Sequence, residues 1–297
     1  MGRRRRSEVI ATRAINGLSR PGLVPHPLAP SLAARVEGRT VLVTGASSGI
    51  GRGLAVRLGA AGATVLVTAR RGDELDQVVG EIEAAGGSAF ALPADLSTED
   101  GVDELADKVL AEHGTPHVLV NNAGRSIRRS IARSEHRLHD YERAMQINYL
   151  GAVGITLRML PGMRERRSGH VLTSSSIGVT ADLPRFSAYI GSKAALEAFC
   201  RVAAVECLAD GVRFTTVHLP LVDTEMIGPS GWSFSALTVD EAVDMMVDGL
   251  RRRPREVNSP LGTLTRAGLQ LMPERTRRSL HLFHRWVPDS PAARETE

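Results

Sequence analysis

The chain has 297 residues, of which 42% are hydrophobic and 24% charged, with a formal net charge of +4; these values are ordinary for a globular protein of one large or two small domains. No apolar run approaches the ~18 residues of a membrane-spanning helix, and the N-terminus lacks the apolar stretch of a secretory signal. Only 4% of residues are aromatic and no nucleic-acid motif is present, which argues against nucleic-acid binding; no metal site is predicted. Cys200 and Cys207 are expected to be reduced, as in a cytoplasmic protein.

Residues 1–38 have the composition of an irregular N-terminal extension. Four prolines exclude a continuous helix there, namely Pro21, Pro25, Pro27 and Pro30, although residues 8–20 suit a short basic amphipathic helix. Residues 1–40 carry eight Arg and two Glu, and residues 251–297 carry ten Arg against five acids, so the basic character lies at the two ends. Such ends are usually solvated, and the alternative is peripheral association with acidic lipid or contact with a polyphosphate substrate.

From residue 39 onward, strand and helix patterns alternate. We expect strands at 40–45, 63–70, 88–95, 117–124, 169–176 and 211–220, and helices at 49–62, 73–86, 99–114, 137–160 and 187–209. The helix over 137–160 is expected to end at Pro161 and Gly162. This alternation predicts an α/β fold: a doubly wound, Rossmann-type parallel sheet forming a single domain over residues 39–260.

Two segments beyond the last long strand pattern lack this alternation. Residues 221–237 have no periodicity and follow the carboxyl end of a strand, the edge where open α/β sheets bind ligands, so we expect a lid over the substrate. Residues 261–297 form an Arg-rich C-terminal tail in which 262–287 is expected to contain one or two amphipathic helices.

A glycine-rich turn, Thr44–Gly51, joins the first strand to the first helix. Gly45 permits a tight turn, Gly49 a close approach to a pyrophosphate, and Gly51 close packing of the helix on the sheet. Ser47, Ser48 and Ile50 complete a turn whose free N–H groups suit a phosphate. At the end of the second strand stands Arg70 in place of an acid, which favours the 2′-phosphate of NADP(H) over the ribose of NAD.

Tyr189 and Lys193 are four residues apart, on one face of a predicted helix, and Ser176 ends the preceding strand. Carbonyl reduction needs a proton donor, and a nearby ammonium together with an oxidised nicotinamide is expected to lower the pKa of the phenol. Ser176 is expected to bind the substrate oxygen. The chain contains 35 Arg and only two Lys, Lys108 and Lys193, so a retained lysine is a candidate for chemistry that guanidinium cannot perform.

With these motifs, the chain resembles the short-chain dehydrogenase/reductase family over about residues 39–260. The resemblance rests on the following motifs and residues: TGASSGIG at 44–51, Asp95, NNAG at 121–124, Asn148, Ser176, the Tyr189–Lys193 pair and Pro220–Thr224. The resemblance implies that Asp95 and Leu96 lie at the adenine, that Asn121, Ala123 and Gly124 flank the cofactor, and that Pro220, Val222 and Thr224 contact its nicotinamide and phosphates. It also implies that Asn148 holds a water in a proton relay towards Lys193, and that helices 137–160 and 187–209 pair into a homodimer or homotetramer.

A narrower resemblance is to the reductase domain of bacterial fatty acyl-CoA reductases, carried by residues 121–131, 139–153 and 218–230. It implies an NADPH-dependent reductase of a fatty acyl-CoA or a lipid aldehyde or ketone, with Tyr189 as general acid. Arg125, Arg128, Arg129 and Arg133 would then meet CoA phosphates or form a solvated rim. Two alternatives stay open: an NAD(P)-dependent dehydrogenase oxidising a lipid or sterol alcohol, and a non-catalytic cofactor-binding scaffold.

Overall fold

The computed structural model describes residue 18, residues 29–226 and residues 236–286. Its centre is a sheet of seven parallel strands in the order β3-β2-β1-β4-β5-β6-β7. The strands are β1 (Thr40–Thr44), β2 (Thr64–Thr68), β3 (Ser88–Ala91), β4 (Val118–Asn121), β5 (Gly169–Ser176), β6 (Val212–Leu219) and β7 (Glu256–Asn258). This order and the flanking helices confirm the predicted doubly wound, single-domain fold.

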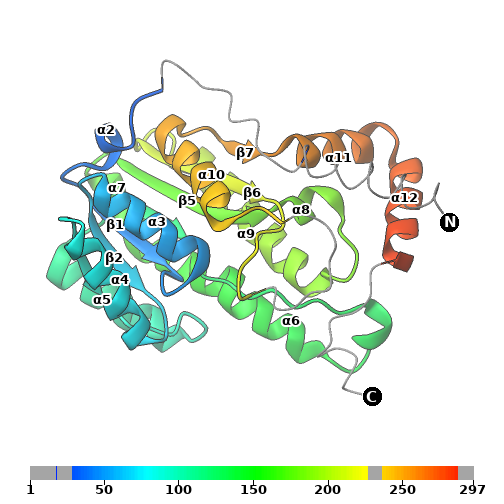
Figure 1. Cartoon of the computed structure of the whole chain (residues 1–297), viewed down its shortest axis with the longest axis horizontal. Coiled ribbons are helices and arrows are strands. Elements are labelled where there is room, and N and C mark those ends of the chain that lie inside the picture. Colours follow the sequence, from blue (N-terminus) through cyan, green and yellow to red (C-terminus); the bar gives the residue numbers. More distant parts are fainter. Residues whose placement is uncertain (1–17, 19–28, 227–235, 287–297) are drawn as a thin grey trace.

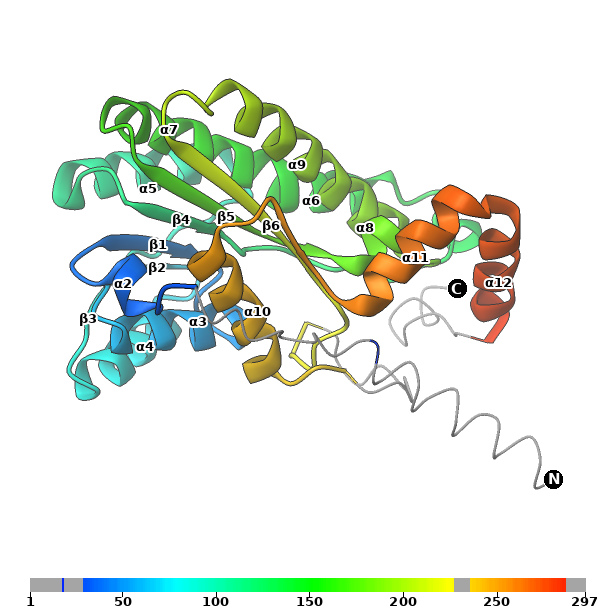
Figure 2. The ribbon, with the colours of Figure 1, turned by 90° about the horizontal axis from the view of Figure 1, so that it is seen from above.

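Helices cover both faces of the sheet (Figure 2). One face carries α3 (Gly49–Ala60), α4 (Gly72–Ala84) and α10 (Val239–Arg252), and the other α5 (Glu99–His113), α7 (Gly151–Glu165) and α9 (Ser187–Glu206). Successive strand residues point to opposite faces, so Val41 and Val43 join one buried layer and Leu42 the other. Two apolar layers explain why the strands read as unbroken apolar runs.

The helix predicted over 137–160 is longer and is interrupted. It comprises α6 (Leu138–Met145), a π-helical turn (Gln146–Leu150) and α7, which runs through Pro161 to Glu165. The prediction that Pro161 and Gly162 end it is wrong. Because Pro161 has no N–H group, the carbonyl oxygen of Leu157 loses its helical hydrogen bond. Both residues are exposed, so water can bind that oxygen instead. Gly162 lies against Thr115, whose Oγ1 would be 2.0 Å from an added Cβ, so this glycine serves packing.

The described residues before β1 pack on the domain. The short helix α2 (Ala33–Val36) buries Val36 in the core, and Arg251 of α10 donates to the carbonyl oxygen of Pro30 at 2.8 Å. The rest of residues 1–38, including the amphipathic helix expected at 8–20, lies outside the described residues apart from residue 18.

The loop expected over 221–237 is described only at its two ends. Backbone hydrogen bonds of 2.8–2.9 Å join Leu221 and Asp223 to Leu237, so the ends lie side by side. The middle of the expected lid, residues 227–235, lies outside the described residues. α10 then begins with a capping box between Thr238 and Glu241.

The C-terminal tail contains two helices, α11 (Pro260–Leu271) and α12 (Pro273–Trp286). They lie together at one end of the molecule, beside the short helix α8 (Ile177–Ala181) that follows β5 (Figures 1 and 2). Within the described ranges, no helix combines the length and the apolar character needed to span a membrane.

Candidate active site

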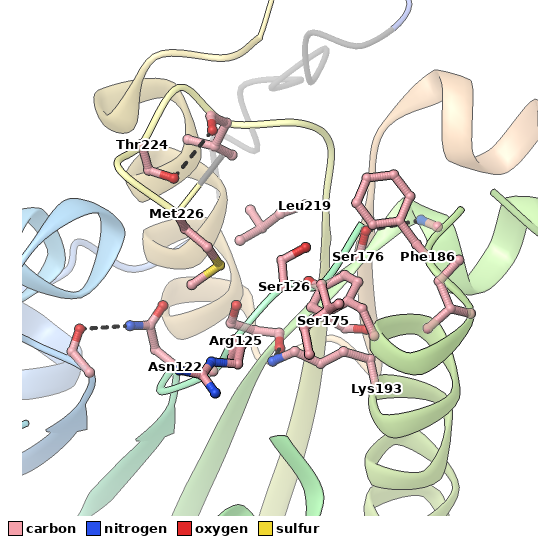
Figure 3. Close-up of a pocket in the computed structure, with 18 of the residues that line it drawn as sticks. Asn122, Arg125, Ser126, Ser175, Ser176, Phe186, Lys193, Leu219, Thr224 and Met226 are labelled. Carbon is pink, nitrogen blue, oxygen red and sulfur yellow. Dashed lines mark hydrogen bonds between the residues drawn. The ribbon is translucent and has the colours of Figure 1, made fainter. Parts of the chain in front are cut away.

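A cavity of about 1330 Å³ opens at the carboxyl edge of the sheet, where the fold predicts a ligand site. The ends of β1, β2, β4, β5 and β6 all reach it, and α8, α9, α11 and α12 complete its wall. Figure 3 shows side chains from these separate elements converging on the cavity, among them Asn122, Ser176 and Lys193.

The turn between β1 and α3 forms a cradle that only glycine permits at two positions. Gly45 has a φ of +66°, and a Cβ there would lie 2.7 Å from the Cα of Ala123. A Cβ on Gly51 would lie 2.1 Å from the carbonyl oxygen of Gly45. Ser47, Ser48, Gly49 and Ile50 line the cavity between them, at the start of α3. Backbone N–H groups at a helix start suit a pyrophosphate, so this cradle fits a dinucleotide.

Asn122 fastens β4 to the glycine turn. Its Nδ2 donates to the carbonyl oxygens of Thr44 and Gly45 at 3.0 and 3.1 Å, and its backbone N–H donates to Thr44 Oγ1 at 3.0 Å. Asn121, predicted to flank the cofactor, is buried instead and donates to Thr156 of α7 at 2.9 Å. Successive strand side chains point to opposite faces, so the cavity-lining residue is Asn122, with Ala123 and Gly124 following it.

The far end of the cavity carries Arg70, Asp95 and Leu96. Arg70 is exposed at the end of β2, whereas its neighbour Arg71 pairs with Glu74 at 2.6 Å. Burial alone would raise the pKa of Asp95, but hydrogen bonds from Ser97 and the charges of Arg70 and Arg125 hold it below its usual value. Asp95 is therefore an ionised acceptor within the electrostatic reach of Arg70.

Ser176, Tyr189 and Lys193 meet at the centre of the cavity. Ser176 ends β5 and caps α8, accepting from the N–H of Gly178 at 3.0 Å, and it also hydrogen-bonds the Tyr189 hydroxyl. Lys193 lies one turn after Tyr189 on α9; it is buried, and its Nζ donates to the carbonyl oxygen of Ser174 at 2.9 Å. Two of the three ammonium hydrogens stay available to other acceptors.

Burial dominates the titration of both groups on α9. It raises the pKa of Tyr189 to about 12, despite the opposing hydrogen bond from Ser176. It lowers the pKa of Lys193 to about 8, with Glu197 acting in the other direction. The sequence predicts a lowered pKa for Tyr189, caused by a nearby ammonium together with an oxidised nicotinamide. In the protein alone this prediction is wrong, because burial raises the pKa of Tyr189.

Asn148 lies in the π-helical turn between α6 and α7 and is fully buried. Its Oδ1 accepts from the N–H of Arg125 at 2.7 Å, while its Nδ2 donates to the Arg125 carbonyl and to Ser192 Oγ, both at 2.9 Å. Ser192 in turn donates to the Tyr189 carbonyl at 2.7 Å. The side chain of Asn148 thus connects the segment after β4 to the first turns of α9, next to Tyr189.

A buried carboxylate, Glu197, lies one turn beyond Lys193. It accepts a hydrogen bond from Ser175 Oγ, its Oε1 lies 3.1 Å from His218 Nε2, and Arg201 is 3.9 Å from its Oε2. Its negative charge stabilises the ammonium of Lys193. No motif singled out Glu197 in the sequence, because its effect depends on strands β5 and β6 reaching the same helix.

The remaining predicted cofactor residues also lie at the cavity. Pro220, Val222 and Thr224 line it after β6, and Thr224 stands next to the backbone of Gly49. Other lining residues were missed, among them Ser126, Phe186, Leu219 and Met226 (Figure 3). Ile190 and residues of α11 and α12 were missed as well. Of the arginines expected at the substrate, Arg133 does not line the cavity, whereas the other three do. Arg137 and Arg143, which were not expected there, line it as well.

Comparison with known proteins places this architecture in one family. The model described as short chain dehydrogenase matches residues 39–231, more than half of the chain. The chain belongs to the short-chain dehydrogenase family. The family resemblance seen in the motifs is confirmed, and the chain is an oxidoreductase of that family.

Three similar proteins illustrate the relationship. An uncharacterised oxidoreductase of Mycobacterium tuberculosis is 45% identical over 267 residues, covering 88% of this chain and 78% of the relative. A fatty acyl-CoA reductase of Acinetobacter baylyi is 41% identical over 260 residues, covering 87% of this chain and 88% of the relative. A metagenomic short-chain oxidoreductase solved in complex with NADP has 30% identity and a TM-score of 0.66, covering 76% of this chain and 97% of that one.

Proposed function

We propose that the protein uses NADPH to reduce the carbonyl group of a long-chain fatty acyl-CoA or lipid aldehyde. One observation carries the proposal: a single cavity contains the dinucleotide cradle, the Ser176–Tyr189–Lys193 group, an apolar wall and a rim of arginines. The 41% identity to a fatty acyl-CoA reductase supports the same substrate class.

The choice of NADPH rests on Arg70. It is exposed at the end of β2 and lines the cavity, where a guanidinium can bind a 2′-phosphate. An acidic residue at the end of β2 would favour NAD by binding the ribose hydroxyl groups. Asp95 is not such a residue, because it follows β3 and its carboxylate accepts hydrogen bonds from Ser97. The NADP-bound neighbour is consistent with this preference.

The protein's own groups supply the proton and hold the substrate oxygen. Bound NADPH would provide the hydride for the carbonyl carbon. The Tyr189 hydroxyl donates its proton to the carbonyl oxygen as negative charge develops there, and Lys193 stabilises the resulting phenolate. Ser176 Oγ accepts from Gly178 and its hydroxyl faces that of Tyr189, so a substrate oxygen would bind between these two hydroxyl groups. With a thioester the result of this addition is a thiohemiacetal; its carbon–sulfur bond then breaks, its hydroxyl proton passes to the departing sulfur, and the products are an aldehyde and the thiol.

The arginine rim (Arg125, Arg128, Arg129, Arg137 and Arg143) supports a substrate that carries phosphates. Arg129 and Arg137 each lie 3.1 Å from buried Asp140, so two guanidinium groups of the rim share this one carboxylate. The charges of Arg137 and Arg129 lower the pKa of Asp140 against the opposing effect of burial. Arg125 and Arg143 are exposed at the cavity, suitably placed for pyrophosphate.

The test is to measure NADPH consumption by the purified protein with acyl-CoA thioesters and with free aldehydes, each in a series of about 8 to 18 carbons. Turnover of thioesters would support the proposal that the protein is an acyl-CoA reductase. Turnover of aldehydes alone would indicate a carbonyl reductase, in which the arginine rim does not bind CoA. If neither is consumed, the reductase proposal is wrong, and oxidation of lipid alcohols with NADP is the assay to run next.

A further inference from the structure

The C-terminal hairpin, α11 and α12, presents a continuous uncharged surface to the active-site cavity. The lining residues of α11 follow the spacing of one helix face, and so do those of α12. They are Leu261, Leu264, Thr265 and Gly268 on α11, and Thr276, Ser279 and Leu280 on α12. From Leu261 to Gly268 the α11 wall is about 10 Å long, given the rise per residue of a helix.

The hairpin is fixed to the domain by contacts that its sequence dictates. Ser259 caps α11 by accepting from the N–H of Gly262 at 3.2 Å, and Arg266 pairs with Glu256 of β7 at 2.7 Å. An added Cβ on Gly262 would lie 3.0 Å from Ile177 Cγ2, so α11 packs closely on α8. This attachment makes the hairpin a wall of the cavity.

The second helix is held in place by the first helix and by the segment before α9. Gly268 allows close approach of Thr276, whose Oγ1 would be 3.0 Å from an added Cβ. Arg185 donates to the carbonyl oxygen of His284 at 3.3 Å, near the end of α12. Both helices therefore keep a defined face towards the cavity.

The surface beside the hairpin is also apolar. Ile177 and Ala181 of α8, Leu183, Phe186 and Ile190 line that side. Leu264 is 57% exposed although it faces the cavity, so apolar area lies open to water until a ligand covers it. The arginine rim comes from different elements, the segment 125–137 and α6. The cavity is thus divided into a basic part and an apolar part.

We propose that α8 and the α11–α12 hairpin form an acyl groove that holds the hydrocarbon tail of the substrate, with Thr265 in the wall of this groove. This inference rests on the proposed function for its substrate class and assigns residues 260–280 a binding role. Thr265 suits the test because its side chain lies at the groove, whereas Thr263 on the same helix is exposed and does not line the cavity.

The experiment compares Thr265→Phe with the matched control Thr263→Phe. Both threonines bond the carbonyl four residues earlier, at 2.8 and 3.1 Å, so the two changes cost the helix similarly. The first readout is binding of cis-parinaric acid, a fluorescent fatty acid, to the NADP⁺-saturated protein. The second is the ratio of kcat/KM for hexadecanal and octanal.

We expect Thr265→Phe to weaken fatty-acid binding about tenfold, as the loss of roughly two buried methylenes would. It should also lower the hexadecanal-to-octanal ratio by a similar factor, while Thr263→Phe changes neither value. Equal effects of the two variants, or no effect of Thr265→Phe, would overturn the inference. If Thr265→Phe does not fold, judged by its thermal transition, Ser279→Phe on exposed α12 takes its place.

Binding and turnover separate the two proposals. One outcome is that the wild type binds the fatty acid and Thr265→Phe binds it more weakly, but neither aldehydes nor thioesters are reduced. This would refute the proposed function and support the groove. A protein that reduces these substrates with an unchanged chain-length ratio would support the function and refute the groove. A protein that neither binds nor reduces them would refute both.

Discussion

The ammonium of Lys193 donates to the carbonyl oxygen of Ser174 at 2.9 Å, two residues before the catalytic candidate Ser176 on the same strand. The bond joins α9 to the end of β5, so one contact orients the lysine relative to both Tyr189 and Ser176. Because Lys193 is only 3% exposed, this position requires a compact cation with a directed donor.

Lys193→Arg should therefore lower kcat/KM by at least about a hundredfold, the scale of a lost acid–base contribution. The planar guanidinium keeps the charge but is too large for the buried position next to Gly124. Lys108→Arg is the control, since Lys108 is exposed on α5 and is the only other lysine. Steady-state kinetics check both variants, and a Lys193→Arg enzyme within threefold of wild type would contradict this account.

The pH dependence of kcat/KM should reflect the pKa of Lys193, which the charge of Glu197 influences. The pKa of Lys193 is lowered to about 8 by burial, and the negative charge of Glu197 opposes that shift. As pH rises through this value the ammonium is lost, and reduction should slow. Glu197→Gln removes the opposing charge, so the pKa of Lys193 falls further and the alkaline limb of kcat/KM moves to lower pH.

The control for this profile is Glu206→Gln, the same change at an exposed position of α9. The other ionisable side chains near Glu197 are Arg201 on its own helix and His218 on β6, and both remain in the variant. An alkaline limb that stays in place in Glu197→Gln, or that moves equally in the control, would show that Glu197 does not act on Lys193.

Cofactor preference should depend on Arg70. Arg70→Gln is expected to raise the KM for NADPH about tenfold to a hundredfold, the value of a hydrogen bond to a charged group, with little change for NADH. Arg213→Gln, an exposed change on β6 away from the cavity, should alter neither value. Parallel titrations with the two cofactors measure the preference, and an unchanged NADPH-to-NADH ratio in Arg70→Gln would exclude a role for this arginine.

The cradle makes a prediction for stability. Gly51→Ala places a Cβ 2.1 Å from a backbone oxygen, so the free energy of unfolding should fall by about 1–3 kcal/mol and NADP⁺ binding should weaken. Gly191→Ala in α9 has no atom within 4 Å of the new Cβ and should stabilise the protein by up to about 1 kcal/mol. Urea unfolding distinguishes these outcomes, and equal stabilities would mean that the turn relaxes without cost.

Local patterns were sufficient to predict six of the seven strands and the positions of Ser176, Tyr189 and Lys193, because each follows from a short apolar run or a helical spacing. The three-residue edge strand β7 and the helix α10 were not predicted. Asn121 was chosen over Asn122 because sequence alone does not say to which face of the sheet each side chain points. The sequence predicts a helix end at Pro161, because proline removes a helical hydrogen bond. The helix continues because this position is exposed to water, and exposure depends on the packing of the whole structure. The roles of Glu197 and of residues 260–280 depend on contacts between distant elements, which no local pattern contains.

The most direct measurement is the rate of NADPH oxidation by wild-type protein and by Tyr189→Phe, each with palmitoyl-CoA and with hexadecanal. The variant keeps the ring and removes the proton donor. We predict turnover by the wild type and a loss of about 10²–10⁴-fold in the variant. Turnover that survives in Tyr189→Phe would contradict the assignment of the proton donor, and a wild-type protein inactive on both substrates would contradict the proposed reaction.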